Sequence, residues 1–523
     1  MPRVLVTEKI AEPGLDLLRE AGHEVDVQLD LSPEQLLEAI VGAYALIIRS
    51  ATTVTAAVLE AGTSLKVVGR AGIGLDNVDV PRATELGVMV VNAPQSNIIS
   101  AAEQAMALLL AQARNVPQAH KALVNGSWER SKWEGVELYG KTMGVIGLGR
   151  VGALFAQRAM AFGMRMVAYD PFISEDRASH MGVELMGLED VMAQSDFISV
   201  HLPKNKDTLG LINADLLAKA KPGIRIINTA RGGIVVEADL AAAIASGHVG
   251  GAGLDVFEKE PTTESPLFSL DSVVVAPHLG ASTFEAQDKA GVTIAEQVNL
   301  ALAGDFVPFA VNVSAGEVSE TVRPFMAIAE QLGAFFGGLH DALPSDVEVI
   351  CQGELAGSGT GILTLCVLKG IFATKIDEPV SFVNAPQVAE SHGLSVKESS
   401  TMTAQEFVSL IEVRSGSHSV AGTLLGHGHK VEPKIVMVDD HYLEVSPTAN
   451  MLVVNNDDRP GMIGRVGTAL GAAGVSISSM AVGPNEGKGT ALMVLTTDKA
   501  APEAALAELQ ADDAISAIHA ISL

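Results

Sequence analysis

Cysteine, aromatic side chains and positive charge are all scarce in this 523-residue sequence. Its two cysteines, Cys351 and Cys366, are too few for a disulfide framework and fit a protein of the reducing cytoplasm. Lysine and arginine number 35 against 62 aspartates and glutamates, which gives a formal net charge of −27. Because a surface that binds nucleic acid needs net positive charge, this composition argues against a nucleic-acid partner.

Long hydrophobic runs are also missing. A membrane-spanning helix needs about 18 or more apolar residues, and the best stretch here, Ala105–Ala111, is much shorter. The N-terminus has no cationic segment followed by a hydrophobic one, so we expect neither a secretory signal nor a membrane partner. Hydrophobic residues still make up 48% of the chain, enough to bury large cores. At about 150 residues per domain, the length predicts three or four domains.

Buried strand-like runs alternate with helical stretches from Val4–Thr7 to Val88–Asn92. This alternation predicts βα units around a parallel sheet. Ser100, with Glu103 in capping-box spacing, predicts the start of a long helix. The next segment, Asn115–Lys141, is less periodic and predicts an irregular arm.

The alternation restarts at Thr142, which predicts a second α/β unit. A second capping signature, Ser282 with Glu285, predicts a helix that ends near Gly304. Val313–Glu320 has the composition of a linker.

The rest of the chain divides into two further parts. Val347–Val445 holds strand-like runs with glycine turns, and Met451–Leu523 follows the order strand–helix–strand–strand–helix–strand. That order is typical of the split βαβ pattern of small regulatory domains. The helices expected in these parts are Pro324–His340, Gly461–Ala473 and Pro502–Leu509.

The strongest chemical signal is the sequence Gly147-Leu-Gly149-Arg-Val-Gly152, which follows a strand and opens a helix. Glycines in this position allow a tight turn and the close approach of a pyrophosphate to the helix N-terminus. The next strand ends at Asp170, whose carboxylate can accept hydrogen bonds from the adenosine ribose and would repel a 2′-phosphate. The pattern therefore favours NAD over NADP. A glycine turn used only for packing is the alternative.

Three residues after strand-like runs are candidates for catalysis. Arg231 follows a buried strand, and its planar guanidinium suits a carboxylate, although a surface salt bridge is an equally open interpretation. His278 and Glu260 each follow a strand and would form a general base if they touched. A structural role is the alternative for His278, and His201 is a weaker candidate for the base.

Other side chains carry weaker signals. Arg49 and Arg70 lie at strand ends, and Arg130 lies in the irregular arm. Trp128 and Trp133 of that arm suggest packing against a partner subunit or, equally, against the chain's own surface. A metal site is not expected from the cluster His427, His429 and His441, because it lacks a nearby cysteine and the helical spacing of zinc ligands.

Six motifs, taken in order, resemble the D-2-hydroxyacid dehydrogenase family. Within it, the chain resembles over its whole length the long members that carry an intervening domain and an ACT domain. The resemblance implies the NAD-dependent oxidation of 3-phospho-D-glycerate to 3-phosphooxypyruvate, the first step of phosphorylated L-serine biosynthesis. The motifs are GRAGIGLDNVD (Gly69–Asp79), NIISAAEQAMALLLA (Asn97–Ala111), GKTMGVIGLGRVG (Gly140–Gly152), NTARGG (Asn228–Gly233), LDVFEKEP (Leu254–Pro261) and APHLGAST (Ala276–Thr283).

The same resemblance implies the fold. It consists of two doubly wound, Rossmann-like α/β domains for substrate and NAD, an α+β intervening domain and a ferredoxin-like ACT domain. The implied substrate-binding domain covers residues 1–98 and the returning helix 283–314, with the NAD-binding domain, 99–282, between them. The intervening domain covers 315–448 and the ACT domain 450–523. The resemblance further implies a homodimer or homotetramer.

Site residues follow from the resemblance position by position. Arg231 would bind the substrate carboxylate, His278 would accept the C2 hydroxyl proton, and Glu260 would orient His278. The implied cofactor residues are Gly147, Gly149, Arg150, Val151, Gly152, Asp170, Thr229, Ala230, Asp255 and Gly280. The implied substrate residues are Arg49, Arg70, Gly74, Asn97 and Arg130, with Arg130 reaching across from a neighbouring subunit.

The chain departs from serine-regulated members at Ser476, where those members carry an asparagine. A hydroxyl cannot replace the amide's donor and acceptor together, so tight inhibition by serine is not expected. Two other functions stay open at this point. One is the oxidation of another 2-hydroxy acid, related to hydroxypyruvate, glyoxylate or 2-hydroxyglutarate. The other is a non-catalytic protein that senses NAD.

Overall fold

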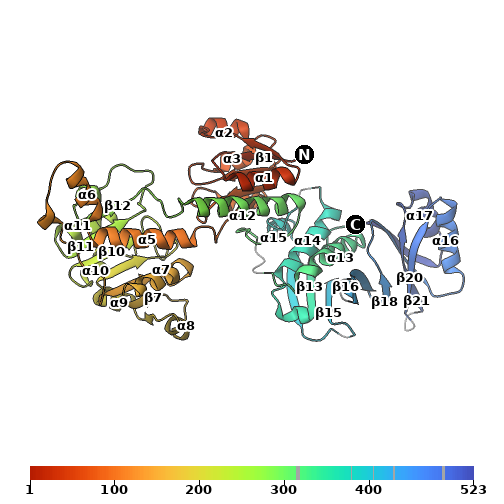
Figure 1. The fold of residues 1–523 in the computed structure, drawn as a ribbon. Helices are drawn as coiled ribbons and strands as arrows, with labels where there is room; N and C mark the ends of the chain where they lie inside the picture. Colours follow the sequence, from red (N-terminus) through yellow and green to blue (C-terminus); the bar gives the residue numbers. More distant parts are fainter. Residues whose placement is uncertain (314–317, 378–379, 405, 428–429, 486–488) are drawn as a thin grey trace.

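A computed structural model describes residues 1–313, 318–377, 380–404, 406–427, 430–485 and 489–523. These residues form four β-sheets. Figure 1 shows the first sheet and its helices at the top, the second at the left and the last two at the right. The predicted boundary between residues 314 and 315, and His429 of the histidine cluster, lie outside the described residues.

The first sheet is parallel, with strand order β2-β1-β3-β4-β5. Alternate residues of β1 enter different cores, Val4 and Val6 on one face and Leu5 on the other, so both faces are covered. Its strands are β1 (Arg3–Val6), β2 (Glu24–Val27), β3 (Ala45–Ile48), β4 (Val67–Arg70) and β5 (Met89–Asn92). Its helices are α1 (Glu12–Glu20), α2 (Pro33–Ala39), α3 (Ala56–Ala61) and α4 (Val80–Glu85).

Helix α12 (Phe284–Ala303) returns to this first sheet and packs beside α1. The two helices touch at glycines, since a Cβ added to Gly14 would lie 2.5 Å from the carbonyl oxygen of Gly291. Ile294 and Val298 of α12 enter the same core as Val4 and Val6. The sheet thus takes one of its covering helices from a distant part of the sequence.

The second sheet is also parallel, with order β12-β11-β10-β9-β6-β7-β8. The chain leaves β6 to one side and returns to its other side, which makes a switch point where ligands bind in such sheets. Its strands are β6 (Thr142–Ile146), β7 (Arg165–Tyr169), β8 (Glu184–Leu185), β9 (Phe197–Val200), β10 (Ile224–Asn228), β11 (Val249–Leu254) and β12 (Val273–Val275). Its helices are α5 (Ile98–Ala113), α6 (Val116–Val124), α7 (Arg150–Ala161), α8 (Glu175–His180), α9 (Leu188–Gln194), α10 (Ala214–Ala218) and α11 (Glu237–Ala245), with the 3₁₀ turns η1 (Arg130–Trp133) and η2 (Pro266–Ser269).

The third sheet is mixed, with order β14-β13-β15-β16-β17-β18 and one parallel pair, β13 with β14. Its strands are β13 (Asp346–Gly353), β14 (Ser395–Thr401), β15 (Ser409–Ser415), β16 (His418–His427), β17 (Lys430–Val438) and β18 (His441–Val445). Its helices are α13 (Met326–Gly338), α14 (Gly361–Lys375) and α15 (Ala385–Ser391), with the 3₁₀ turns η3 (Arg323–Phe325) and η4 (Glu354–Gly357). The strand-like runs expected in Val347–Val445 are present as β13 to β18, and the same stretch also contains α14 and α15, which the sequence pattern did not indicate.

The fourth sheet is antiparallel, with order β20-β21-β19-β22. Leu452 and Val454 of β19 face the two helices, whereas Met451 and Val453 join the core of the third sheet, so both faces are covered. Its elements are β19 (Asn450–Asp457), α16 (Met462–Ala472), β20 (Ile477–Asn485), β21 (Thr490–Thr497), α17 (Glu503–Gln510) and β22 (Ile515–Ser522). The predicted order of this last unit is confirmed.

Three local predictions need correction. Helix α5 begins at Ile98, so Ser100 lies in its first turn and bonds Thr283 Oγ1 (2.8 Å). Thr283, not Ser282, caps α12, because its side chain accepts the N–H of Ala286. The arm Asn115–Lys141 is partly regular, since it contains α6 and η1. Among the described residues, no helix combines the length and apolar character needed to cross a membrane.

We expect Gly14→Ala to destabilise the first sheet and its helices. Its methyl group would meet the backbone of Gly291, and overpacking of this kind costs about 1–3 kcal/mol. The matched control is Gly464→Ala in α16, where an added Cβ meets no atom within 4 Å. Thermal unfolding of both variants checks this, and a Gly14→Ala protein as stable as the unsubstituted chain would contradict the close helix contact.

Candidate active site

Two adjoining cavities open where the loops of the first and second sheets meet. The first, of about 590 Å³, is lined by Arg49, Arg70, Glu260 and His278. The second, of about 380 Å³, is lined by His278 together with Gly74, Asn97, Val151, Thr229, Ala230, Arg231 and Gly280. His278 therefore faces both cavities, and the structure gathers most of the predicted site residues around it.

His278 and Glu260 are in contact, which the sequence alone could not establish. Nδ1 of His278 lies 2.6 Å from Oε2 of Glu260, and Oε1 of Glu260 accepts the N–H of Phe257 (2.8 Å). Burial by itself raises the pKa of Glu260, but these hydrogen bonds and the nearby positive charge outweigh it and lower the pKa below its ordinary value. An ionised carboxylate at Nδ1 assigns the proton to that nitrogen and leaves Nε2 to act on a ligand.

The backbone at His278 has a left-handed conformation, with φ 56°, that a non-glycine residue adopts only when its surroundings hold it. Asp255, buried at the end of β11, supplies this support. Its carboxylate accepts the N–H groups of Leu279 (2.8 Å) and Gly280 (2.7 Å) and a bond from Gln104 (3.1 Å). Burial raises the pKa of Asp255. The carboxylate thus holds the loop that aims His278.

Arg231 lies in the loop after β10 and lines the second cavity together with His278. Its Nη1 donates to the carbonyl of Ala230 (2.8 Å), and its Nε lies 3.4 Å from Oδ2 of Asp76. Buried Asn228 shapes this loop, because its side chain accepts the N–H of Ala230 and donates to the carbonyl of Arg231. Asn228 belongs to the NTARGG motif but was not singled out as a site residue.

Arg49 and Arg70 bring positive charge to the first cavity. Burial, and then the charge of Arg231, lower the pKa of Arg70 to about 10, so this guanidinium stays charged at neutral pH. Its Nε is buried without a hydrogen-bond partner among the described residues. Arg130, by contrast, lies exposed in η1 and lines neither cavity, so this single chain does not bring it to the site.

The glycine loop before α7 leaves room for a pyrophosphate. A Cβ on Gly147 would lie 2.7 Å from the carbonyl oxygen of His201, and one on Gly152 would lie 2.1 Å from that of Gly147. At Gly149, by contrast, a Cβ would meet nothing within 4 Å. Arg150 then begins the helix, whose first N–H groups are not capped by a side chain. A tight turn, open space and free N–H groups are what a dinucleotide phosphate needs.

Two more residues fit a dinucleotide. The Asp170 carboxylate closes the glycine loop onto β7 by accepting the N–H groups of Leu148 (2.8 Å) and Phe172 (2.9 Å). Thr229 lines the second cavity, and its Oγ1 is buried without a partner among the described residues. Such an unpartnered hydroxyl fits a polar ligand in that cavity.

His201 does not qualify as the base. Its Nε2 lies 2.8 Å from the hydroxyl of Ser199, and its ring lies against Phe155. Burial lowers the pKa of His201 to about 3, so the ring stays neutral and has little basicity. Only His278 of these two histidines has a carboxylate partner.

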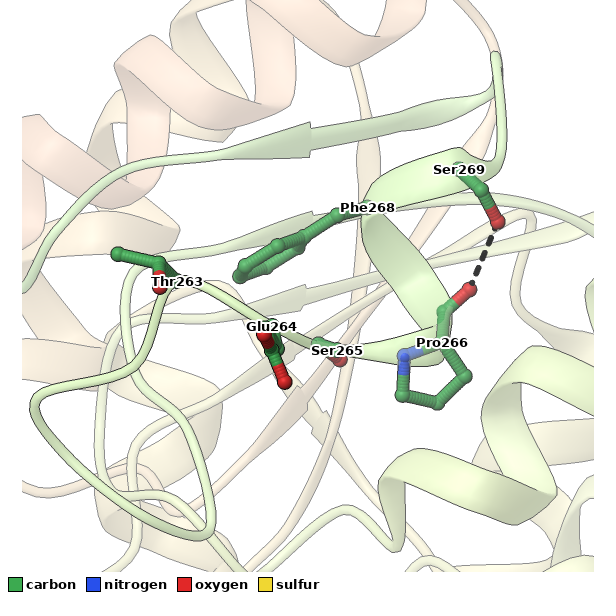
Figure 2. Close-up of a pocket in the computed structure, with 6 residues that line it drawn as sticks. All are labelled: Thr263, Glu264, Ser265, Pro266, Phe268 and Ser269. Carbon is green, nitrogen blue, oxygen red and sulfur yellow. Dashed lines mark hydrogen bonds between the residues drawn. The ribbon is translucent and has the colours of Figure 1, made fainter.

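A third hollow adjoins the first cavity, since Phe268 lines both. Figure 2 shows this hollow along η2 and the loop that precedes it, with a hydrogen bond from Ser269 to the carbonyl of Pro266. Of its six lining residues only Glu264 is ionisable, so it offers no cation to an acidic ligand. Among the described residues, no group of three or more histidine, cysteine or acidic side chains is placed to hold a metal ion.

Three family models match the chain. Residues 106–280 match the NAD-binding domain of D-isomer specific 2-hydroxyacid dehydrogenases. Residues 321–439 match the D-3-phosphoglycerate dehydrogenase intervening domain, and residues 450–514 match the ACT domain. The predicted fold class and the NAD cofactor are confirmed by these matches.

Relatives match over nearly the full length. The D-3-phosphoglycerate dehydrogenase of Mycobacterium tuberculosis (strain ATCC 25618 / H37Rv) is 48% identical over 511 residues, 96% of each chain. That of Bacillus subtilis (strain 168) is 38% identical over 505 residues, 95% of each chain.

Solved structures resemble the first two units. The TT0316 protein of Thermus thermophilus has a TM-score of 0.55 at 34% identity, covering 59% of this chain and 99% of its own. An NAD-dependent formate dehydrogenase from Staphylococcus aureus, solved with NAD, has a TM-score of 0.52 at 29% identity, covering 57% of this chain and 95% of its own. Together, the domains and the full-length relatives show that the chain belongs to the D-3-phosphoglycerate dehydrogenase family.

Proposed function

We propose that the protein catalyses the NAD-dependent oxidation of 3-phospho-D-glycerate to 3-phosphooxypyruvate, the first step of phosphorylated L-serine biosynthesis. One observation carries the proposal. The carboxylate-held His278 lies between a cavity lined by Arg231 and a cavity lined by Arg49 and Arg70. A three-carbon acid with a carboxylate at one end and a phosphate at the other matches this distribution of charge.

In the proposed reaction, Arg231 binds the carboxylate and polarises the C2 oxygen, beside Gly74 and Asn97. Nε2 of His278 takes the proton of the C2 hydroxyl. Glu260, whose pKa is low, stabilises the imidazolium that results. NAD supplies, when bound, the acceptor for the hydride that C2 loses.

The cofactor would lie on the glycine loop, with its pyrophosphate at Gly147, Gly149, Arg150, Val151 and Gly152. Asp170 would accept bonds from the adenosine ribose, using lone pairs that its backbone contacts leave free. On the nicotinamide side, Thr229, Ala230 and Gly280 line the second cavity, and Asp255 holds Gly280 in place.

Regulation and assembly are part of the proposal. The arm around α6 exposes Val116, Leu123, Val124 and Trp128, and a homodimer or homotetramer would cover this apolar surface and bring Arg130 to a partner's site.

The ACT domain would bind an effector, but Ser476 lacks the amide that suits an amino acid. Serine is therefore expected to inhibit weakly, and the enzyme is expected to work in the cytoplasm.

Removal of the proposed base, His278→Ala, should lower kcat by about 10²–10⁴-fold, because general base catalysis contributes that much. Affinity for NADH should stay within about twofold, since the glycine loop is untouched. Initial rates of NADH formation and fluorescence titration measure the two effects. The control is His180→Ala at the exposed end of α8, which should match the unsubstituted enzyme. Unchanged turnover in His278→Ala would contradict the assigned base.

The variant Arg49→Ala tests the phosphate end. Loss of one charged hydrogen-bond donor should raise the KM for 3-phosphoglycerate about tenfold or more. The KM for unphosphorylated D-glycerate should change little, because that substrate has no phosphate to bind. Steady-state kinetics with both substrates measure the difference. Equal losses for both would favour an enzyme for another 2-hydroxy acid, and NAD binding without any turnover would favour a sensing protein.

A further inference from the structure

The loop after β4 contacts the arginines of both cavities through adjacent residues. Oδ2 of Asp76 lies 3.4 Å from Nε of Arg231. Next to it, Nδ2 of Asn77 donates to the backbone carbonyls of Arg49 (2.8 Å) and Thr52 (2.6 Å). One dipeptide therefore spans the distance between the side chain assigned to the carboxylate and the loop assigned to the phosphate.

The loop after β3, residues 49–52, is called here the Arg49 loop, and Glu8 also binds it. The Glu8 carboxylate accepts the backbone N–H groups of Arg49 (2.8 Å), Ala51 (3.1 Å) and Thr52 (2.9 Å). With Asn77 on two of its carbonyls and Glu8 on three of its N–H groups, the loop has a defined backbone conformation. Because these contacts use only the backbone of Arg49, its side chain is available to line the first cavity.

Arg231 is held in a comparable way. Nη1 donates to the carbonyl of Ala230, Nε faces Asp76, and Nη2 lies where a Cβ on Gly74 would be only 2.4 Å away. Asp76 and Gly74 follow β4 of the first sheet, whereas Arg231 follows β10 of the second sheet. The ion pair between Asp76 and Arg231 therefore crosses the cleft between the two sheets. The Asp76 side chain is 66% exposed, which makes the charge attraction worth little by itself. The contribution of this ion pair is that it orients the Arg231 guanidinium.

Asp76 and Glu8 also act on the three site arginines through their negative charge. Burial and the charge of Arg231 depress the pKa of Arg70, whereas the charges of Asp76 and Glu8 act in the opposite direction. The two carboxylates therefore offset part of the repulsion among Arg49, Arg70 and Arg231. Both carboxylates thereby stabilise the grouping of the three cations.

We propose that Asp76 and Asn77 are positioning residues that set the separation between Arg231 and the Arg49 loop. They thereby select a substrate whose carboxylate and phosphate are as far apart as in a three-carbon acid. Asp76 acts through the side chain of Arg231, and Asn77 acts through the backbone carbonyls of Arg49 and Thr52. The inference rests on the proposed function, because it assumes that the two arginines bind the two ends of one molecule.

The test uses two small anions that each resemble one end of the substrate. Inhibition constants (Ki) of inorganic phosphate and of oxamate are measured against 3-phosphoglycerate in the NADH-forming reaction of the full-length enzyme. Asn77→Ala should raise the Ki of phosphate about tenfold and leave that of oxamate within about twofold. Asp76→Ala should raise the Ki of oxamate about tenfold and leave that of phosphate within about twofold. Asp76→Asn should recover most of the loss, because its amide oxygen can still accept a bond from Nε.

The control is Asp79→Ala in the same loop. Asp79 caps α4 by accepting the N–H of Arg82, and within the described part of the chain it forms no hydrogen bond with Arg49, Arg70 or Arg231. It should lower the Tm without separating the two Ki values. If Asn77→Ala does not fold, Asn77→Ser keeps a donor of shorter reach and should raise only the phosphate Ki.

The outcomes separate the two proposals. If the unsubstituted enzyme does not oxidise 3-phosphoglycerate, the proposed function is overturned and this inference with it. If the unsubstituted enzyme is active but both variants raise the two Ki values equally, the positioning role alone is overturned. Opposite selectivity in the Asp76 and Asn77 variants supports the positioning role.

Discussion

The hydrogen bond between Nδ1 of His278 and the Glu260 carboxylate is the contact on which the chemistry of the cleft depends. It joins the loops that follow β11 and β12, and it keeps Nε2 of the imidazole available to a ligand. Asp255 supports the same geometry by binding the two N–H groups that follow His278. Without this support, the left-handed backbone at His278 would relax and the ring would no longer face both cavities.

A second constraint is electrostatic. The chain carries a net charge of −27, yet Arg49, Arg70 and Arg231 face one cleft. Such a grouping attracts an anion against the overall charge of the protein, because field lines concentrate in a cleft. Burial first, and then repulsion from the neighbouring arginines, lower the pKa of Arg70, and the charges of Asp76 and Glu8 act in the opposite direction. The binding site is thus a local balance of charge inside an acidic molecule.

Sequence patterns predicted the parallel sheets, the glycine loop and the last unit, because these depend on local periodicity and on turns. They did not indicate α14, because apolar residues lie on all sides of this buried helix and leave no helical periodicity in the sequence. Capping signatures located the helices near Ser100 and Ser282 only to within one or two residues.

Contacts between distant loops lay beyond sequence reasoning from single positions. Glu260 and His278 were paired as a hypothesis, but their 2.6 Å contact depends on how two loops fold. Asn77 lies within the GRAGIGLDNVD motif, but neither Asn77 nor Glu8 was indicated as a site residue, because an amide or a carboxylate that binds backbone groups looks like any polar residue in a sequence. Their roles follow only from the positions of the loops in three dimensions.

The most direct test compares NADH formation from 3-phosphoglycerate and from D-glycerate under the same conditions. The two substrates differ only in the phosphate, so the ratio of their kcat/KM values measures the contribution of the arginine-lined cavity. If this cavity binds the phosphate, kcat/KM should be about a hundredfold or more higher for 3-phosphoglycerate, since two charged contacts are made. Equal values for the two substrates would contradict the assignment of the cavity to a phosphate.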